Sequence, residues 1–346
     1  MGPPSEAQAH RIVEKLLSEW LGTDAPQLEE SRQGADWSSK WKGRTLLIEY
    51  KRSTEATSIT GAITQVLSHA KRAGKRAIPI VAVPYMGDVG QRLCAEAGVD
   101  WLDLSGNASI RVDGLVIQVR GNENRFKRLG RPSTAFSPKA ARITRQLLIH
   151  PDTPLLQKEL AELADLGAGY TSKVVHRLEA DGLLLRGDDG RVKPKDPALL
   201  LDAWSEQYAF DKHHIVRGHV SARTSDALLK KVSSTLKSSE TRHAATGLAG
   251  AWLLTKFATF RVTTVFVEAA GLDLLMEEAG FREEPRGANT WLVVPNDEGV
   301  FHGATPKNGV VCAHPVQVYL DLLNHPERAQ EAAEEVRKLL LPARRN

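Results

Sequence analysis

The sequence predicts a multidomain protein in which an α/β domain, a compact helical segment and a mixed α/β or α+β domain follow one another. The first observation is its length, because 346 residues exceed what one hydrophobic core usually serves. The second is that strand and helix patterns alternate up to about residue 120. The third is a run of three short amphipathic helices and a hairpin. We therefore expect an α/β domain at 1–120, a linker at 121–136, a helical domain at 137–196 and a C-terminal domain at 197–346.

Composition limits the class of protein. The chain is 42% apolar and 25% charged, as in soluble globular proteins. No apolar run approaches the roughly 18 to 20 residues that span a bilayer, and the N-terminus is a charged amphipathic helix rather than a signal peptide. We expect a cytoplasmic protein with no membrane contact. Cys94 and Cys312 lie far apart without ligand spacing, which favours core residues over a disulfide or a zinc site.

A hairpin is the most informative feature of the N-terminal domain. The stretches 35–41 and 44–51 are predicted strands, joined by Lys42 and Gly43 as a two-residue turn with glycine where a positive φ is needed. Counting outward from this turn places Asp36 directly opposite Glu49. Because side chains alternate along a strand, Glu49 and Lys51 share one face. Two carboxylates and an ammonium group therefore converge on one side of the hairpin.

Like charges that face each other across a strand pair are destabilising unless they are neutralised, and a divalent cation with oxygen ligands does this well. The pattern of Asp36, Glu49 and Lys51 resembles the acid, acid-x-lysine layout of the PD-(D/E)xK nuclease-like superfamily. The resemblance implies Mg²⁺ (or Mn²⁺) held by Asp36 and Glu49, with Lys51 polarising the attacking water or the phosphate. The alternative is a solvated salt bridge on an exposed strand face.

Two further site residues follow from the same resemblance. Glu6 extends the apolar stripe of a helix expected over 5–21, and an acid on a buried face calls for a partner. Gln65 lies in a helix expected over 58–73, which leads to the strand 77–83 in a right-handed parallel crossover. Members of the superfamily often supply a first-helix acid, and some carry a site glutamine. The alternatives are a solvated helix end and a solvent-facing glutamine.

Positive charge is concentrated in the middle of the chain. Residues 120–195 hold fifteen Lys or Arg against nine Asp or Glu, whereas the whole chain has a net charge of +4. This region begins with a Gly-, Asn- and Arg-rich run from Arg120 to Pro132. Such a run is usually a solvated connector, but beside a DNA-binding module it can also follow phosphates.

The helical segment carries the pattern of a DNA-binding module. Helices are expected over 137–149, 156–164 and 170–181, followed by strands at 183–186 and 191–194. Three helices and a basic hairpin make a winged helix-turn-helix, and residues 178–192 resemble the end of the recognition helix and the wing of winged-helix regulators. The alternative is a winged helix used only for protein contacts.

The third helix of such a module enters the major groove of double-stranded DNA and reads bases, whereas the wing meets phosphates. The residues expected to contact DNA are Tyr170, Thr171, Ser172, Lys173, His176 and Arg177 on the helix, with Arg191 and Lys193 on the wing.

Residues 197–346 have the mixed pattern of an α/β or α+β domain. Helices are expected over 225–236, 246–257, 272–279, 315–323 and 326–341, and strands over 262–267, 290–294 and 310–312. His213, His214 and His219 lack acids or cysteines at ligand spacing, which favours a solvated or phosphate-facing patch over a metal site.

The last part of the chain resembles the C-terminal domain of AbiEi-type antitoxins of type IV toxin–antitoxin systems. The resemblance rests on residues 314–322, the segment 326–329 and the run 332–334, and the phrase Leu102–Asn107 also recurs in larger relatives. It implies an autoregulatory transcriptional regulator that binds double-stranded DNA, with a cognate toxin or a second copy of itself as partner. The chain departs from the simplest antitoxin plan because its winged helix lies mid-chain, after a nuclease-like domain.

Two functions remain open at this point. One is a regulator in which the N-terminal domain is a scaffold that helps to grip DNA or a partner. The other is a Mg²⁺-dependent DNA endonuclease that its winged helix directs to the target.

Overall fold

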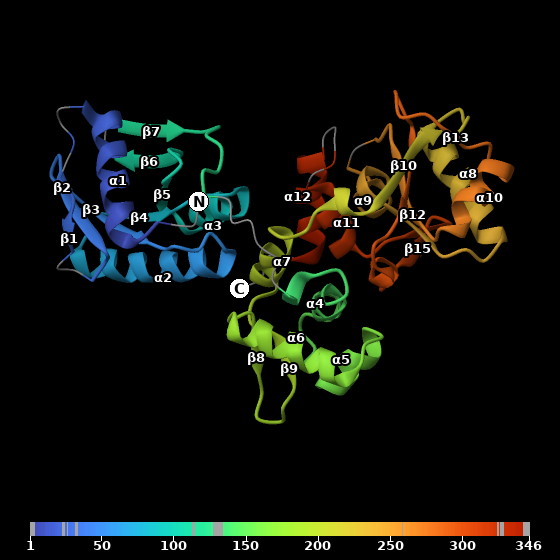
Figure 1. Cartoon of the computed structure of the whole chain (residues 1–346), viewed down its shortest axis with the longest axis horizontal. Coiled ribbons are helices and arrows are strands. Elements are labelled where there is room, and N and C mark those ends of the chain that lie inside the picture. Colours follow the sequence, from blue (N-terminus) through green and yellow to red (C-terminus); the bar gives the residue numbers. More distant parts are fainter. Residues whose placement is uncertain are drawn as a thin grey trace. The chain divides into compact units, whose positions relative to one another are not determined.

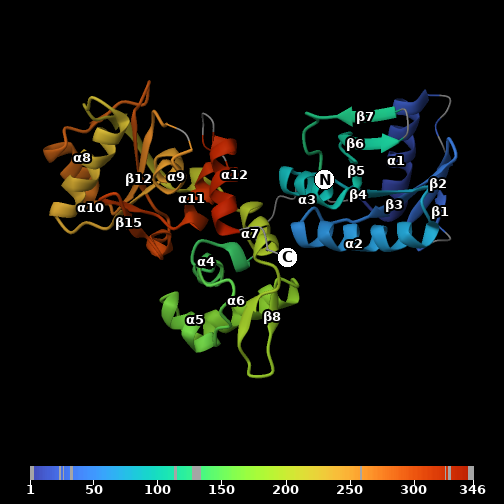
Figure 2. The same cartoon turned by 180° about the vertical axis from the view of Figure 1, so that it is seen from behind.

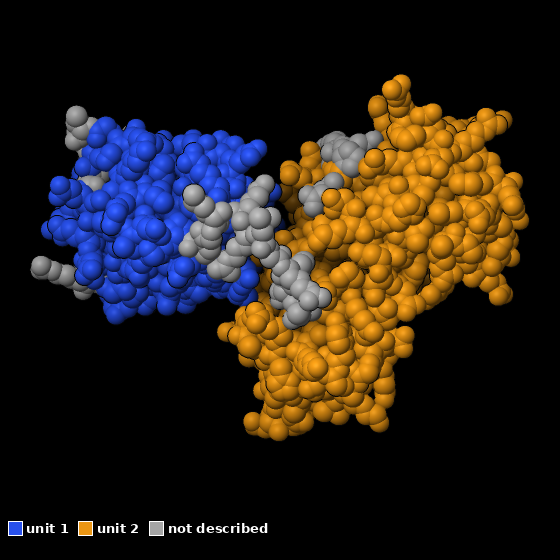
Figure 3. Space-filling model, viewed as in Figure 1, with its two compact units in different colours: residues 1–131 blue, residues 132–346 orange. Residues whose placement is uncertain are grey.

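The computed structural model describes residues 4–22, 25, 27–31, 34–112, 115–126, 134–257, 259–323, 325 and 329–341. The chain forms two compact units, residues 1–131 and residues 132–346 (Figure 3). Each unit contains one seven-stranded sheet of mixed direction with helices packed against it. The expectation of several mixed α/β folds in one chain is therefore confirmed.

Unit 1 is built on a sheet whose strands follow one another in chain order (Figure 1). The central strands β3, β4 and β5 are parallel, and the strands on either side of them are antiparallel to their neighbours. The strands are β1 (Glu29–Glu30), β2 (Trp37–Trp41), β3 (Arg44–Tyr50), β4 (Ala77–Val83), β5 (Asp100–Asp103), β6 (Ala108–Val112) and β7 (Leu115–Val119).

Helices cover both faces of this sheet. Helix α1 (Glu6–Leu21) packs Ala9, Val13 and Leu17 against one face, whereas α2 (Ala56–Ala73) and α3 (Asp88–Ala97) pack against the other. The predicted parallel crossover is confirmed, because α2 connects β3 to β4. It is followed by a second one, in which α3 connects β4 to β5.

The β2–β3 hairpin has the predicted register. Trp41 pairs with Arg44, and the ladder runs to the pair of Trp37 and Ile48. Both turn residues have a positive φ, 47° at Lys42 and 75° at Gly43, as a type I′ turn requires. The turn thus fixes the alignment that brings Asp36 to the level of Glu49.

Unit 2 contains a second seven-stranded sheet with the order β13-β10-β14-β12-β11-β16-β15. Figures 1 and 2 show α8 and α10 on one side of it and α9, α11 and α12 on the other. Its strands are β10 (His214–His219), β11 (His243–Thr246), β12 (Thr263–Val267), β13 (Arg282–Glu283), β14 (Thr290–Val294), β15 (Thr305–Lys307) and β16 (Val310–Cys312). Its helices are α8 (Ser225–Ser238), α9 (Gly247–Thr255), α10 (Ala270–Glu278), α11 (Pro315–Leu322) and α12 (Ala329–Leu340).

A three-helix segment precedes this sheet in the chain. It comprises α4 (Ala141–Ile149), α5 (Gln157–Leu163) and α6 (Ala168–Ala180), followed by the two-stranded sheet of β8 (Leu184–Arg186) and β9 (Val192–Pro194). Helix α7 (Pro197–Ser205) leads on to the C-terminal sheet. These elements begin and end within a few residues of the predicted bounds.

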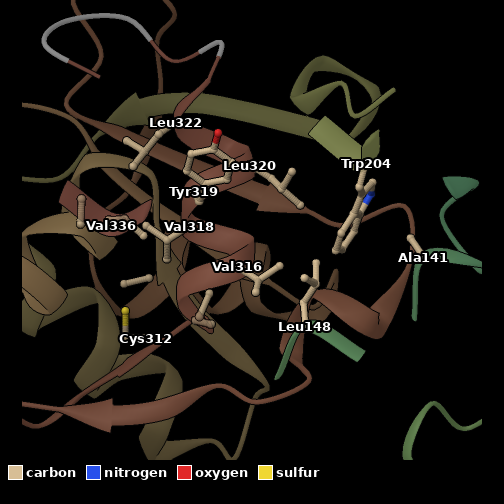
Figure 4. Close-up of a cluster of buried hydrophobic side chains, with 14 of the residues drawn as sticks. Ala141, Leu148, Trp204, Cys312, Val316, Val318, Tyr319, Leu320, Leu322 and Val336 are labelled. Carbon is tan, nitrogen blue, oxygen red and sulfur yellow. The ribbon is translucent and has the colours of Figure 1, made fainter. Parts of the chain in front are cut away.

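Helix α4 joins the three-helix segment to the C-terminal domain. Every residue from Ala141 to Leu148 is buried, so the helix has no solvent-facing side. Figure 4 shows its Leu148 in one apolar cluster with Trp204 of α7 and Val316 of α11. Helix α4 therefore belongs to the cores of both parts of unit 2.

Polar side chains of α4 make specific contacts with the C-terminal domain. The Arg142 guanidinium bonds both carboxylate oxygens of Asp297, at 2.8 and 2.9 Å, and Glu298 at 3.1 Å. Arg145 donates to the side-chain oxygen of Gln317 and lies over the ring of Trp204, 5.1 Å from its centroid. Burial lowers the pKa of Arg145 to about 10, so the guanidinium stays charged at neutral pH.

Gln317 connects Arg145 to a buried carboxyl group, that of Asp321. Its amide donates to Asp321 at 2.7 Å, and Asp321 also accepts bonds from the hydroxyls of Tyr208 and Thr246. Asp321 is fully buried, and burial raises its pKa to about 7 against the opposing effect of these bonds and of Arg145. One connected polar network therefore runs from α4 to the start of α9.

The raised pKa of Asp321 predicts a pH-dependent stability. The folded chain keeps this proton up to about pH 7, whereas the unfolded chain loses it near the ordinary value of 3.8. Asp321 should therefore reduce the free energy of unfolding as pH rises from about 4 to about 7, by up to about 4 kcal/mol. Asparagine does not titrate, so the free energy of unfolding of Asp321→Asn, minus that of the wild type, should increase as pH rises across this range. Urea denaturation at fixed ionic strength measures this difference. A difference between the two proteins that does not change with pH would contradict the prediction.

Candidate functional site

The acidic site of unit 1 centres on Glu49. This residue is only 4% exposed, and its side chain lies on the face of β3 that packs against α2 and α3. Lys51, which follows β3, donates from Nζ to Glu49 Oε1 at 2.7 Å. The predicted pairing of these two side chains on one face is therefore present, as a part-buried ion pair rather than a fully solvated one.

Asp36 lies on the other arm of the hairpin, at the level of Glu49. It directly precedes β2. The last pair of the ladder is Trp37 and Ile48, so the next position along the hairpin aligns Asp36 with Glu49. Its Oδ2 accepts a hydrogen bond from the backbone N–H of Tyr50 at 2.8 Å, so the carboxylate continues the contact between the two strands. The hairpin thus brings Asp36 and the end of β3 together, as expected.

One oxygen of the site has no partner. Glu49 Oε2 is buried and makes no hydrogen bond with any described residue. A buried carboxylate oxygen without a partner is costly, and a bound cation would offset that cost. Asp36 and Glu49 are the residues that could hold such a cation. No group of three or more His, Cys, Asp or Glu that could hold a metal occurs in the described part of the chain.

The other two residues predicted for the acidic site, Glu6 and Gln65, are both exposed. Glu6 is exposed in the first turn of α1, so the expectation of a buried acid on the helix stripe is wrong. Ser5 is the N-cap of α1, so Glu6 is the first residue of the helix. Burial above all raises the pKa of Tyr50 to about 12, and the charge of Glu6 makes a smaller contribution in the same direction. Gln65 is exposed on α2.

Helix α6 presents most of its predicted DNA-contacting residues to solvent. Tyr170, Lys173, His176 and Arg177 are exposed, and Ser172 is half-buried. Thr171 is fully buried, so its expected place on the exposed face is wrong. It precedes Val174 by three residues and Val175 by four, which puts it on the apolar side of the helix. Its hydroxyl has no partner among the described residues.

Several cations of the segment are already paired. Arg177 bonds Asp181 at 3.0 Å, and Arg191 bonds Glu159 at 3.0 Å. Lys173 and Lys193 are exposed and make no ion pair with another described residue. The lysines are therefore the predicted contacts that remain available to an external anion.

The histidines of the C-terminal domain do not form one surface patch. His213 is buried, bonds Tyr208 at 2.9 Å and accepts a bond from the backbone N–H of Asn296 at 3.1 Å. Burial lowers its pKa to about 4, with a smaller contribution from Arg145. His214 is exposed, and His219 is half-buried. The expected solvated patch is therefore wrong for His213, which is part of the buried polar network.

Residues 193–341 match the family described as the AbiEi antitoxin, a transcriptional regulator of type IV toxin–antitoxin systems. We call residues 193–341 the AbiEi-type domain after this match. No curated protein and no solved structure is significantly similar to the chain. Within the described residues, no helix is both long and apolar enough to span a membrane.

The sequence interpretation missed the polar residues that hold the AbiEi-type domain to α4. Arg142, Arg145, Gln317 and Asp321 were not among its candidates, although a signal was present. Gln317 and Asp321 are four residues apart in the otherwise apolar α11, and Arg142 and Arg145 are three apart in α4. Polar side chains at helical spacing on an apolar helix indicate a buried polar contact.

The burial of Thr171 gives a direct test of which face of α6 is available. Thr171→Val replaces a buried hydroxyl without a partner by a methyl group of similar size, which removes a desolvation cost. We expect the variant to be more stable by about 1 kcal/mol and to bind DNA like the wild type. Urea denaturation and a DNA titration measure the two effects. Loss of DNA affinity in a stably folded variant would return Thr171 to the contact surface.

Proposed function

We propose that this protein is a sequence-specific double-stranded DNA-binding transcriptional regulator of the AbiEi antitoxin type. In this proposal residues 137–196 are a winged helix-turn-helix, with α6 as the recognition helix and β8 and β9 as the wing. The observation that carries it is the exposed polar face of α6, a helix that shortly precedes the AbiEi-type domain in the sequence.

The order of the elements supports this assignment. The family match begins at Lys193 in β9 and extends to Leu341, so it includes the end of the last strand of the wing. Helices α4, α5 and α6 precede it directly. A helix-turn-helix needs its first helices to be held so that the third can enter the major groove. The full burial of α4 provides such a support.

The charges on α6 and the wing fit a phosphate-rich partner. Lys173 on α6 and Lys193 on β9 are exposed without an ion pair to a described residue, and Lys139 lies over the ring of Tyr170 at 5.7 Å. The wing tip also carries Asp188 and Asp189, which would be repelled by phosphates. We therefore assign DNA contact to the strands of the wing rather than to its tip.

The DNA-binding proposal predicts the effect of single lysine changes. We expect Lys173→Ala to weaken binding to the DNA upstream of the gene by about 1 to 3 kcal/mol if it contacts a base. If it contacts a phosphate instead, the loss is uniform across sequences and the slope of log K against log salt falls by about one. Fluorescence anisotropy at several salt concentrations measures both quantities.

Lys231→Ala is the matched control, because Lys231 is an exposed lysine on α8 of the same unit. It should leave affinity and salt slope unchanged. Equal effects of Lys173→Ala and Lys231→Ala, or unchanged affinity with both Lys173→Ala and Lys193→Ala, would refute α6 and the wing as the DNA-binding surface.

Similarity to an antitoxin family also suggests a protein partner for this chain. An antitoxin of a type IV system acts together with a toxin, so we propose a cognate toxin as the partner of the AbiEi-type domain, with self-association as the alternative. The product of the neighbouring gene is the protein to test for complex formation.

A second function, metal-dependent DNA cleavage, is favoured by one observation in unit 1. Glu49 Oε2 is buried without a described partner, Lys51 bonds the other oxygen of this carboxylate, and Asp36 bonds the backbone N–H of the next residue, Tyr50. In this proposal Asp36 and Glu49 hold Mg²⁺ or Mn²⁺, which would activate water and neutralise charge on a phosphodiester. Lys51 holds Glu49 in place and presents a positive charge to the phosphate.

The cleavage proposal is tested on supercoiled plasmid with Mg²⁺ or Mn²⁺. We expect the wild type to nick or linearise the plasmid, and Asp36→Asn, Glu49→Gln and Lys51→Met to fall to the rate seen with EDTA. Glu96→Gln, at an exposed acid of α3, is the control and should cut like the wild type. Absence of wild-type cutting, together with no rise in melting temperature on adding either metal, would leave the regulator as the sole function.

A further inference from the structure

The first part of the expected linker is held firmly in unit 1. Asn122 donates its backbone N–H to Asn107 Oδ1 at 2.9 Å, and Asn107 Nδ2 donates to the Asn122 carbonyl at 3.1 Å. Asn122 Nδ2 also donates to the Gly106 carbonyl at 2.9 Å, and the backbone N–H of Arg125 donates to Ser105 Oγ at 3.3 Å. Four hydrogen bonds therefore fix residues 122–126, which sequence composition alone assigns to a solvated connector.

The turn that holds this segment is itself rigid. Asp103 is fully buried and accepts bonds from the backbone N–H groups of Met86 at 3.0 Å and Asn107 at 2.9 Å, and from Asn107 Nδ2 at 2.9 Å. Gly106 has a φ of 102°, which few other residues adopt, and a Cβ there would lie 3.2 Å from Asn122. The phrase Leu102–Asn107 thus has a structural role, which is to position the chain after β7.

This arrangement forms a groove between the segment and α1. The groove has a volume of about 440 Å³ and is lined by residues of α1, of the turn after β5 and of residues 119–126. Trp20, Leu16 and Phe126 supply apolar surface, and Lys15 and Arg125 supply positive charge. We name it the connector groove. It lies beside the carboxyl end of β5, the edge at which open α/β sheets bind ligands.

The lining residues favour one class of ligand. Two half-buried aromatic rings next to exposed cations are the combination with which proteins bind unpaired nucleotides, since rings stack on bases and cations meet phosphates. Among the described lining residues Glu19 is the one acid, and it pairs with Lys15 at 3.6 Å on the exposed side of α1. The Arg125 guanidinium makes no ion pair with a described residue and is exposed.

We propose that the connector groove binds an unpaired nucleotide of single-stranded DNA, with its base against Trp20 and Phe126 and its phosphate at Arg125 and Lys15. A base within a duplex is stacked on its neighbours and does not enter such a groove. This site is separate from α6 and from the acidic site, and it stands whether or not the proposed duplex binding by α6 is correct. It gives unit 1 a contact with a DNA strand.

The experiment uses the full chain and a fluorescently labelled 20-mer of oligothymidylate at low salt, with fluorescence anisotropy as the readout. We expect Trp20→Leu, which keeps an apolar side chain but removes stacking, to weaken binding by about 5- to 100-fold. Arg125→Gln should weaken it about three- to tenfold and reduce the salt dependence. Glu19→Gln should strengthen it, because an opposing charge is removed.

Two controls separate this site from the others. Lys71→Gln, at an exposed lysine of α2, should leave binding unchanged. Lys173→Ala should affect duplex binding and not oligothymidylate binding. Circular dichroism melting confirms that each variant is folded.

Three results would overturn the proposal. The first is wild-type affinity for oligothymidylate in both Trp20→Leu and Arg125→Gln, and the second is no measurable binding by the wild type. The third is tighter binding of the matching oligouridylate, which would replace DNA by RNA as the ligand.

Discussion

The structure of unit 2 depends on the burial of Arg145. A guanidinium removed from water is costly, and this one is compensated by Gln317 on α11 and by the ring of Trp204 on α7. Its Nε has no partner among the described residues, so the compensation is incomplete. The arrangement persists because Arg145 is part of a network with Gln317 and Asp321. Removing one member of such a network would leave the others buried and unpaired, at a cost of about 3 to 5 kcal/mol.

This constraint has a consequence for the proposed recognition of DNA. A winged helix on a flexible tether would search for its site independently of the domain that follows it. Here α4 carries Arg142 and Arg145 into the AbiEi-type domain, so the three-helix segment and that domain share a core. The contacts of α4 with the AbiEi-type domain therefore help to set the orientation of α6, and we expect a change at Gln317 or Asp321 to act on α6 through α4.

Much of the fold could be predicted because its local signals are strong. The β2–β3 register followed from a two-residue turn with Gly43, and α6 followed from the spacing of Val174, Val175 and Leu178. Strands β1, β6, β7, β10, β11, β13 and β15 were missed. They are short and carry small or polar residues such as Ser109, Arg217 and Ala244, so their pairing depends on neighbours that are distant in sequence.

Some residues of the candidate sites were placed correctly from the sequence, and others were misplaced or missed. Asp36 and Glu49 could be aligned because hairpin pairing is a matter of counting. Thr171 was placed wrongly because threonine is compatible with either environment, although its spacing of three and four residues from Val174 and Val175 indicates the apolar side of α6. Arg142 and Arg145 were missed because sequence alone assigns arginine to the surface. Their burial is stabilised by Asp297 and by Gln317 on α11, which are more than 150 residues away in the sequence.

The buried carboxyl groups of this chain differ in one respect that bears on function. Asp103 and Asp321 are each surrounded by donors, and in Asp321 both oxygens accept bonds. Such groups are satisfied by the fold and need no ligand. Glu49 is nearly as buried, yet one of its oxygens has no donor within the described residues. Arg145 Nε and the Thr171 hydroxyl also have no partner among the described residues, but only the Glu49 oxygen belongs to a carboxylate that a cation could neutralise, as the proposed metal site requires.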